Sequence, residues 1–498
     1  MRAHVAWSAA LAAALTLVVP ARVHGELDLR TMVVEHRLAN GMKFLLVRRG
    51  SAPVFTAYLR VKAGGADEAR GKTGLAHLLE HLAFKGTPVI GTRDWDQEQP
   101  LLLEIAQAGD ELARPDGSKE RSARLKAQIS ELSQKARGLE RENALMQLLV
   151  RNGASGLNAE TDKDLTSFYV SLPANRLELW ALLEASRLAA PVPRDFYAER
   201  SVVMEERRER VENEPIGMLL EELTAIGFST SPYRWPVVGY PGDLESLSMR
   251  DALEFHRVHY APANAVGAIV GDIDIEATKA LLDRTFGAIP ARPAPPPLTA
   301  VEQERRSERR STVFFDAAPQ LAVAWLKPTL PTREDYVFDV IELLTAEGRT
   351  SRLYKSLVTD QALCTDVTAT MTPGARLPHL FVVLATPLGD KPLDQVETAL
   401  LAEIDKLRTE LVTPEELARV RTKLDADFSR QLATNEGLAE TLSFFEAIAG
   451  DWRYLADHRR QIASITAEDV RQVAQRYLVP SNQTVVRLER PAGAKETP

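Results

Sequence analysis

The chain has 498 residues, of which 45% are hydrophobic and 26% are charged, and its formal net charge is −8. This length exceeds what one core usually supports, so we expect two or more domains, and the composition excludes an intrinsically disordered chain. The acidic balance, without a concentrated basic stripe, argues against nucleic-acid binding.

The N-terminal segment predicts export. Arg2 precedes an apolar run from Val5 to Val19, and the small residue Gly25 offers a cleavage point. This is the pattern of a signal peptide over residues 1–25, and the run is too short for a comfortable membrane span. An uncleaved anchor is the alternative. The single cysteine, Cys364, excludes an intrachain disulfide. We therefore expect a periplasmic or secreted protein with no membrane span after cleavage.

A helix with metal-ligand spacing follows the first predicted strands, which run from Met32 to Lys62. The stretch from Gly74 to Thr87 is largely apolar, and its His77 and His81 are four residues apart. Both imidazoles therefore lie on one helix face and can reach one metal ion. Glu80 borders that face, where a carboxylate can take a proton from water. H-x-x-E-H is a metalloprotease signature. Two packed, hydrogen-bonded histidines are the alternative interpretation.

Residues 97–147 predict an inserted helical hairpin. The breaker Pro115-Asp116-Gly117 separates a short helix from a longer one that begins at Ser118. Self-packing of the hairpin is the simpler interpretation, and docking of a partner is the alternative. The longer helix carries a predicted heptad seam formed by Leu125, Ile129, Leu132, Ala136, Leu139, Asn143 and Met146.

A later helix, at about residues 194–212, supplies candidate carboxylate ligands. Its Glu199, Val202, Val203 and Glu206 fall on one stripe, and the valines predict that this stripe faces the interior. Carboxylates on an inward stripe are costly unless they meet a cation or a donor network. A zinc hydrolase usually has three protein ligands and one water, so a carboxylate from this helix would complete the set. A solvated, charged surface helix is the alternative.

A Pro-rich linker at residues 291–310 predicts two domains, residues 26–290 and 311–498. One motif recurs in both at a constant offset, each time before an apolar strand: Asp251, Pro262 and Asn264 in the first, and Asp469, Pro480 and Asn482 in the second. We therefore predict an α+β fold of two homologous α/β sandwich-like domains, each a sheet flanked by helices. The helical hairpin is inserted in the first of them.

The paired motifs resemble those of the insulinase/pitrilysin-type (inverzincin) zinc metallopeptidases, in the branch that includes the mitochondrial processing peptidase. The resemblance rests on His77-Leu-Leu-Glu80-His81 and on Glu199-Arg200-Ser-Val202-Val-Met-Glu-Glu206. It implies one Zn²⁺ per chain, with His77, His81 and Glu206 as ligands, Glu80 as general base and Glu199 in a supporting role. It also implies that Asn158 and Ala159 lie on an edge strand beside an extended peptide substrate.

The sequence departs from the family where related enzymes carry an Arg and a Tyr, seven residues apart, that help to hold the substrate carbonyl. Val358 and Thr365 occupy those places. We therefore predict a zinc endopeptidase that acts on peptides or unfolded segments as a dimer. Its partner would be a metal-free homologous subunit that supplies the Arg and Tyr, or a second copy. A non-catalytic peptide-binding or chaperone-like protein with a structural metal site is the alternative, and the intact Glu80 weighs against it.

Overall fold

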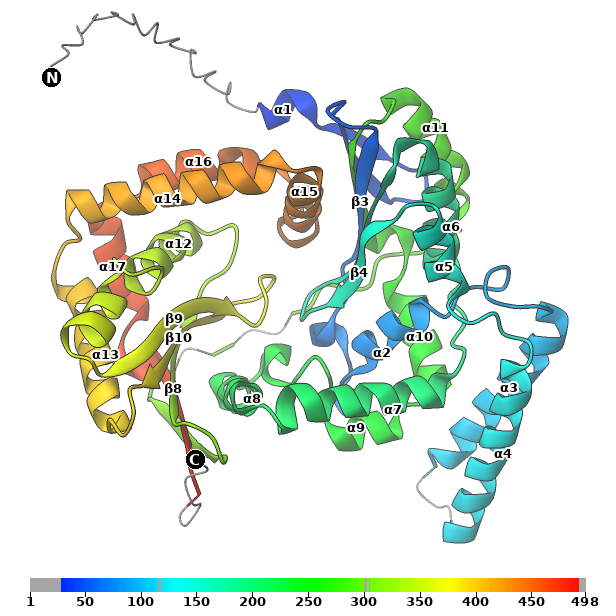
Figure 1. Cartoon of the computed structure of the whole chain (residues 1–498), viewed down its shortest axis with the longest axis horizontal. Coiled ribbons are helices and arrows are strands. Elements are labelled where there is room, and N and C mark those ends of the chain that lie inside the picture. The colour runs from blue at the N-terminus through cyan, green and yellow to red at the C-terminus, as the bar shows by residue number, and fades with distance from the viewer. Residues whose placement is uncertain (1–27, 115–117, 300–301, 304, 492–498) are drawn as a thin grey trace, which may run out of the picture.

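Two sheets organise the chain in a computed structural model, which describes residues 28–114, 118–299, 302–303 and 305–491. The predicted signal peptide, residues 1–25, lies outside these ranges. The first sheet has the strand order β1-β2-β6-β3-β5-β4, and the second has the order β7-β11-β8-β10-β9. Figure 1 labels β3 and β4 of the first sheet and β8, β9 and β10 of the second. The strands are β1 (Val34–Arg37), β2 (Lys43–Arg48), β3 (Val54–Val61), β4 (Ser155–Thr161), β5 (Thr166–Pro173), β6 (Ala265–Gly271), β7 (Arg309–Phe314), β8 (Gln320–Lys327), β9 (Cys364–Thr372), β10 (His379–Pro387) and β11 (Gln483–Glu489).

Helices cover both sheets. In the first half they are α1 (Leu29–Met32), α2 (Leu75–Ala83), α3 (Trp95–Leu112), α4 (Lys119–Arg137), α5 (Ala144–Arg151), α6 (Leu177–Ala189), α7 (Phe196–Arg207), α8 (Pro215–Gly227), α9 (Pro241–Ser246), α10 (Met249–His259) and α11 (Ile275–Arg284). In the second half they are α12 (Arg333–Thr345), α13 (Leu393–Thr409), α14 (Pro414–Ala433), α15 (Asn435–Ala449), α16 (Arg453–Ser464) and α17 (Ala467–Tyr477). Within the parts of the chain that the structure describes, none of these helices is both long and apolar enough to cross a membrane.

The two sheets share one topology, and the predicted fold class is confirmed. Strand β6 pairs parallel with β2 and antiparallel with β3, as β11 pairs with β7 and β8. The recurring asparagine explains part of the repeat. The Asn264 amide donates to His259 O and Lys62 O, and the Asn482 amide donates to Tyr477 O and Leu326 O. In each half, the asparagine therefore ties the end of a helix to the end of the central strand.

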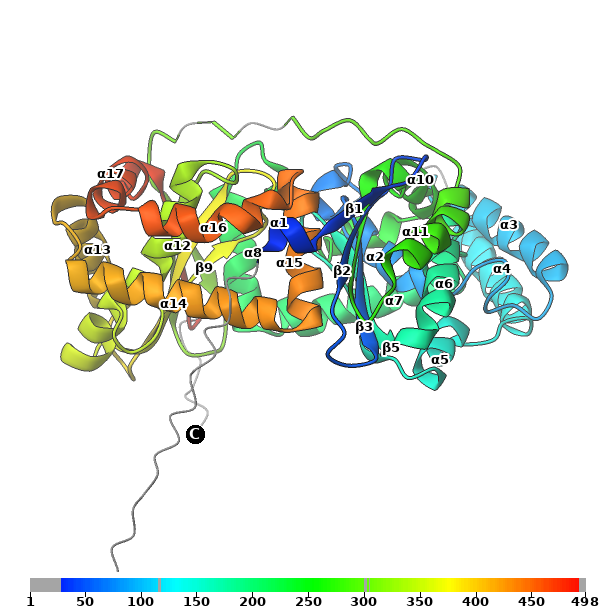
Figure 2. The same ribbon diagram turned by 90° about the horizontal axis from the view of Figure 1, so that it is seen from above.

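Each half also contributes one helix to the sheet of the other half. Helix α15 packs on β3 and β6 of the first sheet, where Leu438 and Leu442 join a core with Val47 and Val270. Helix α8 packs on β7, β8 and β11 of the second sheet. Figures 1 and 2 both place α15 against the first sheet. Two apolar interfaces therefore join the halves, and burial of apolar area stabilises both.

Helices α3 and α4 form an antiparallel hairpin that projects from the first half (Figure 1). Leu125, Ile129, Leu132 and Ala136 of the predicted seam are buried. The prediction that Leu139, Asn143 and Met146 continue this seam was wrong. Helix α4 ends at Arg137, and Asn143 has a left-handed backbone before α5 begins. The chain leaves the helix there because Glu140 pairs with Thr92 across the base of the hairpin.

Candidate metal centre

Helix α2 carries the H-x-x-E-H motif, and a buried carboxylate holds the start of this helix. Gly74, the residue before the helix, has a positive φ of 87° and no side chain to cap it. Glu68 replaces the missing cap, because its carboxylate accepts hydrogen bonds from Gly74 N (3.0 Å) and Ala76 N (2.7 Å). Free N–H groups at a helix start need such an acceptor. Glu68 thus fixes the helix one turn before His77.

His77, His81 and Glu206 converge although α7 is distant in sequence from α2. Their ligand atoms all lie within 4.8 Å of one another, and among the described residues they are the one such group of histidine, cysteine or acidic side chains. Glu206 Oε2 lies 3.6 Å from His77 Nε2 and 3.5 Å from His81 Nε2. Tetrahedral zinc with bonds of about 2.0–2.1 Å separates its ligands by about 3.4 Å. The three side chains therefore fit a zinc ion.

A second carboxylate, that of Glu199, contacts the outer ring nitrogen of His81. Glu199 Oε2 lies 3.5 Å from His81 Nδ1, and Lys85 Nζ lies 2.7 Å from Glu199 Oε1. A carboxylate at the outer nitrogen of a histidine ligand fixes its tautomer and orientation. The second oxygen of Glu206 is also held, because Arg210 lies 2.8 Å from Oε1. His77 Nδ1, by contrast, is buried without a hydrogen-bond partner among the described residues.

The carboxylates of α7 lie at the border between its buried and exposed sides. The prediction that both valines of the stripe face the interior was wrong, because Val203 is buried whereas Val202 is 48% exposed. At 100° per residue, Glu199 and Glu206 lie between these two directions. The stripe is therefore only partly buried, with Val203 on its inner side and Val202 on its outer side. The side chains of Glu199 and Glu206 are each 16% exposed.

Glu80 is buried beside the three candidate ligands and has a partner that sequence reasoning missed. Thr161, the last residue of β4, donates a hydrogen bond of 2.6 Å to Glu80 Oε2. Burial raises the pKa of Glu80, and the hydrogen bond from Thr161 opposes the rise. A raised pKa suits a group that takes up and returns a proton near neutral pH. The only sequence signal for Thr161 is its place at the end of the predicted edge strand.

Asn158 and Ala159 lie on β4, which is the outermost strand in the order of the first sheet. Asn158 is exposed and Ala159 is half-buried. Because side chains alternate along a strand, Ala159 shares the face of Thr161, and Asn158 points to the opposite face. The structure thus places both residues on an edge strand next to the metal helix.

The two positions that depart from the family pattern lie in the second half. Val358 packs against the hydrophobic core inside the second half, and the Thr365 hydroxyl donates to Thr386 O at 3.3 Å on the neighbouring strand. Neither residue offers the guanidinium or phenol that an Arg and a Tyr would supply.

The histidines differ in charge before metal binds, which predicts a pH dependence. Burial lowers the pKa of His77 to about 4. Burial also lowers that of His81, but contacts with Glu199 and Glu206 outweigh it and raise the pKa to about 9. Zinc requires neutral imidazole, so below pH 9 each bound ion must displace a proton from His81. We expect the apparent zinc affinity to rise about tenfold per pH unit between pH 6 and 8, measured by chelator competition. An affinity independent of pH would contradict this assignment.

The fold and the site together define a class. Two related α+β halves, with an H-x-x-E-H helix facing a carboxylate on a second helix, have the architecture of the inverzincin metallopeptidases.

Comparison with known proteins identifies the family. Residues 43–111 match the family described as "Insulinase (Peptidase family M16)", and residues 246–424 match "Peptidase M16 inactive domain". The zinc protease PqqE of Helicobacter pylori is 23% identical over 91% of both chains. The mitochondrial-processing peptidase subunit beta of Lentinula edodes is 22% identical over 89% of this chain and 86% of its own. The crystal structure of a protease from Helicobacter pylori superposes with a TM-score of 0.78 at 22% identity, covering 92% of this chain and 99% of that one.

The chain belongs to the insulinase/pitrilysin-type (M16) family, as its motifs predicted, and its relative PqqE is named a zinc protease. The segment matched as an inactive domain contains none of His77, His81 and Glu206.

Proposed function

We propose that this chain is a zinc-dependent endopeptidase that hydrolyses peptides or unfolded protein segments and holds one zinc ion. The observation that carries the proposal is the convergence of His77, His81 and Glu206 beside a buried Glu80. A purely structural site has no need of a carboxylate next to its open position. The family of zinc proteases to which the chain belongs supports the same reading.

Zinc, when bound, would supply Lewis acidity that polarises a peptide carbonyl and acidifies water. The protein contributes the proton transfers. Thr161 holds Glu80 Oε2, so Oε1 is the oxygen that takes the proton of the attacking water. Glu80 then returns this proton to the leaving nitrogen as the peptide bond breaks. Glu199 keeps His81 oriented throughout by holding its outer nitrogen.

Strand β4 would bind the substrate. Its outer edge carries backbone groups that can pair with an extended peptide, as in other cases of strand addition to a sheet edge. Thr161 ends this strand at Glu80, so a peptide along β4 would lie beside the site. In this proposal Asn158 and Ala159 line the substrate.

A partner subunit would complete the site. Val358 and Thr365 cannot stabilise the substrate carbonyl, so we propose that a metal-free homologous subunit supplies the missing Arg and Tyr, with a homodimer as the alternative. The match to a protein named as a peptidase subunit supports a divided enzyme. The N-terminal segment, residues 1–25, supports a periplasmic or secreted location.

Metal analysis and a peptide-library digest test this proposal directly. We expect one zinc ion per chain, and cleavage that rises on the order of 100-fold when a homologous Arg/Tyr subunit is added, because one donor to a developing oxyanion contributes about that much. Strong cleavage by the lone chain would remove the need for a partner. Zinc binding without cleavage in any combination would favour the peptide-binding alternative.

A further inference from the structure

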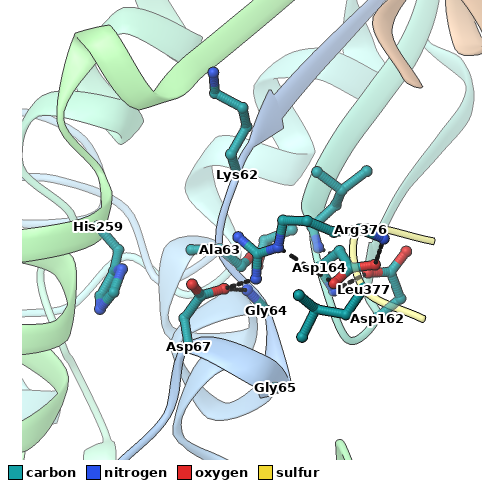
Figure 3. A network of polar contacts seen from close by, with 12 residues as sticks. Lys62, Ala63, Gly64, Gly65, Asp67, Asp162, Asp164, His259, Arg376 and Leu377 are labelled. Carbon is teal, nitrogen blue, oxygen red and sulfur yellow. Dashed lines mark hydrogen bonds and ion pairs between the residues drawn. The ribbon is translucent and has the colours of Figure 1, made fainter. Parts of the chain in front are cut away.

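A loop of the second half contacts buried polar side chains of the first half. This loop, residues 374–377, connects β9 and β10. Its Arg376 side chain lies between Asp67 and Asp164 (Figure 3), with Nη2 2.8 Å from Asp67 Oδ2 and Nε 3.4 Å from Asp164 Oδ1. The two carboxylate side chains are 6% and 2% exposed, so Arg376 is a cation on which buried charges depend.

Backbone groups of the same loop are also held. Ala375 N and Arg376 N donate to Asp164 Oδ2 at 2.7 and 3.0 Å. The fully buried Tyr233 donates its hydroxyl to Asp164 and accepts from Arg376 N and Leu377 N, both at 3.0 Å. Asp164 and Tyr233 of the first half therefore accept hydrogen bonds from three consecutive backbone N–H groups of the loop, those of residues 375, 376 and 377.

Two glycines show how closely the segments approach. A Cβ on Gly374 would lie 2.6 Å from Tyr233 Oη and 2.7 Å from Asp164 Oδ2. A Cβ on Gly64 would lie 2.8 Å from Asp164 N on the other side of the same turn. All three distances are too short for real contacts, so a side chain at either position would displace the atoms that it meets. The turn at residues 162–164 thus lies in close contact with Gly64 of the first half, and its Asp164 carboxylate with Gly374 of the second.

Both segments that Arg376 contacts lead directly to the candidate metal centre. Asp164 follows Thr161, the partner of Glu80, by three residues, and the carboxylate of Asp162 binds Asp164 N and Leu165 N to close the turn. Asp67 precedes Glu68, the carboxylate that caps the metal helix. Arg376 therefore links the position of the second half to the general base and to the helix that carries it.

The network is not needed merely to hold the halves together. Helices α8 and α15 already join the halves through two apolar cores. A buried ion-pair network adds little to such an interface, but it fixes one geometry because each charge has a defined partner. We propose that Arg376, with its loop, is a positioning residue contributed by the second half. It holds β4 and Thr161 so that Glu80 and the substrate edge keep their places. This role rests on the proposed peptidase function.

The test compares variants of the full mature chain. Arg376→Met keeps the aliphatic stem and removes the charge, Arg376→Lys retains the charge, and Tyr233→Phe removes only a hydroxyl. Lys43→Met is the matched control, because Lys43 on β2 pairs with Glu446 on α15 at 2.6 Å, with side chains 12% and 7% exposed. That ion pair also joins the halves, but β2 is separated from β4 by three strands.

We expect Arg376→Met to keep its zinc and to speed hydrogen exchange in residues 155–165 by about tenfold or more, because the turn loses its clamp. Its kcat should fall roughly 10- to 100-fold, as misplaced catalytic groups cost that much, with Arg376→Lys intermediate and Lys43→Met within about twofold of wild type. If Arg376→Met does not fold, Tyr233→Phe decides through the same exchange measurement.

The proposal would be overturned if hydrogen exchange in residues 155–165 were unchanged in both Arg376→Met and Tyr233→Phe. It would also be overturned if Lys43→Met lost as much kcat as Arg376→Met. The exchange measurement requires no substrate. If the wild-type chain and its partner cleave nothing, the proposed function fails. Hydrogen exchange compared between wild type and Arg376→Met, in metal-free and in zinc-loaded protein, still decides whether Arg376 holds β4.

Discussion

Replacing Glu80 with Gln is expected to slow cleavage severely while leaving the metal in place. The amide keeps the shape of the side chain, and its carbonyl oxygen can still accept from Thr161, so His77 and His81 on the same helix are not disturbed. It cannot take a proton at neutral pH. A general base contributes about 10²–10⁴ to the rate, so we expect kcat to fall by about that factor. Zinc content and peptide kinetics measured on the same preparation would check this.

Glu209→Gln is the control for this variant, because Glu209 is an exposed carboxylate just beyond α7. It should leave both kcat and zinc content unchanged within about twofold, as expected for surface substitutions. Full activity in Glu80→Gln would end the proposed mechanism. Loss of zinc together with activity would instead give Glu80 a part in holding the metal.

Local sequence patterns predicted most of the scaffold. The repeated Asp, Pro and Asn motif predicted an apolar strand after each copy, and β6 and β11 follow the two copies. The heptad pattern failed after Ala136, because Gly138 and the pairing of Glu140 with Thr92 end the helix. A repeat of apolar residues indicates which residues are buried, but not that they lie on one helix. Here the next buried residues, Leu145 and Leu149, lie on a separate helix, α5.

The candidate metal ligands could be predicted because they follow from the spacing of residues along two helices. The four-residue interval brings His77 and His81 onto one face, and the α7 stripe contributes Glu206. Thr161 and Arg376 could not be found in this way. Their roles come from contacts between segments distant in sequence, Thr161 with α2 and Arg376 with Asp67 and Asp164. No periodicity marks such contacts, and only the folded chain places them.

Removing a candidate ligand is expected to abolish zinc binding, and cleavage with it, whereas Glu80→Gln should lose cleavage and keep its zinc. Glu206→Ala deletes the oxygen that lies within 3.6 Å of both histidines, and His77→Ala deletes one nitrogen of the same set. Outer-sphere partners already cost 10–100-fold in metal affinity, so a direct ligand should cost more than about 100-fold. We expect both variants to lose zinc on dialysis and to show no cleavage.

Glu205→Ala separates this effect from a general loss of charge on α7. Glu205 is the neighbour of Glu206, its side chain is 59% exposed, and it forms an ion pair with Arg208 on the surface. Wild-type protein and Glu205→Ala should both gain stability on adding zinc, by roughly 4 kcal/mol at a thousandfold excess over Kd, visible as a rise in Tm. Glu206→Ala and His77→Ala should show no rise, because an ion that no longer binds the folded state cannot stabilise it. An undiminished zinc-dependent Tm in Glu206→Ala would place the third ligand elsewhere.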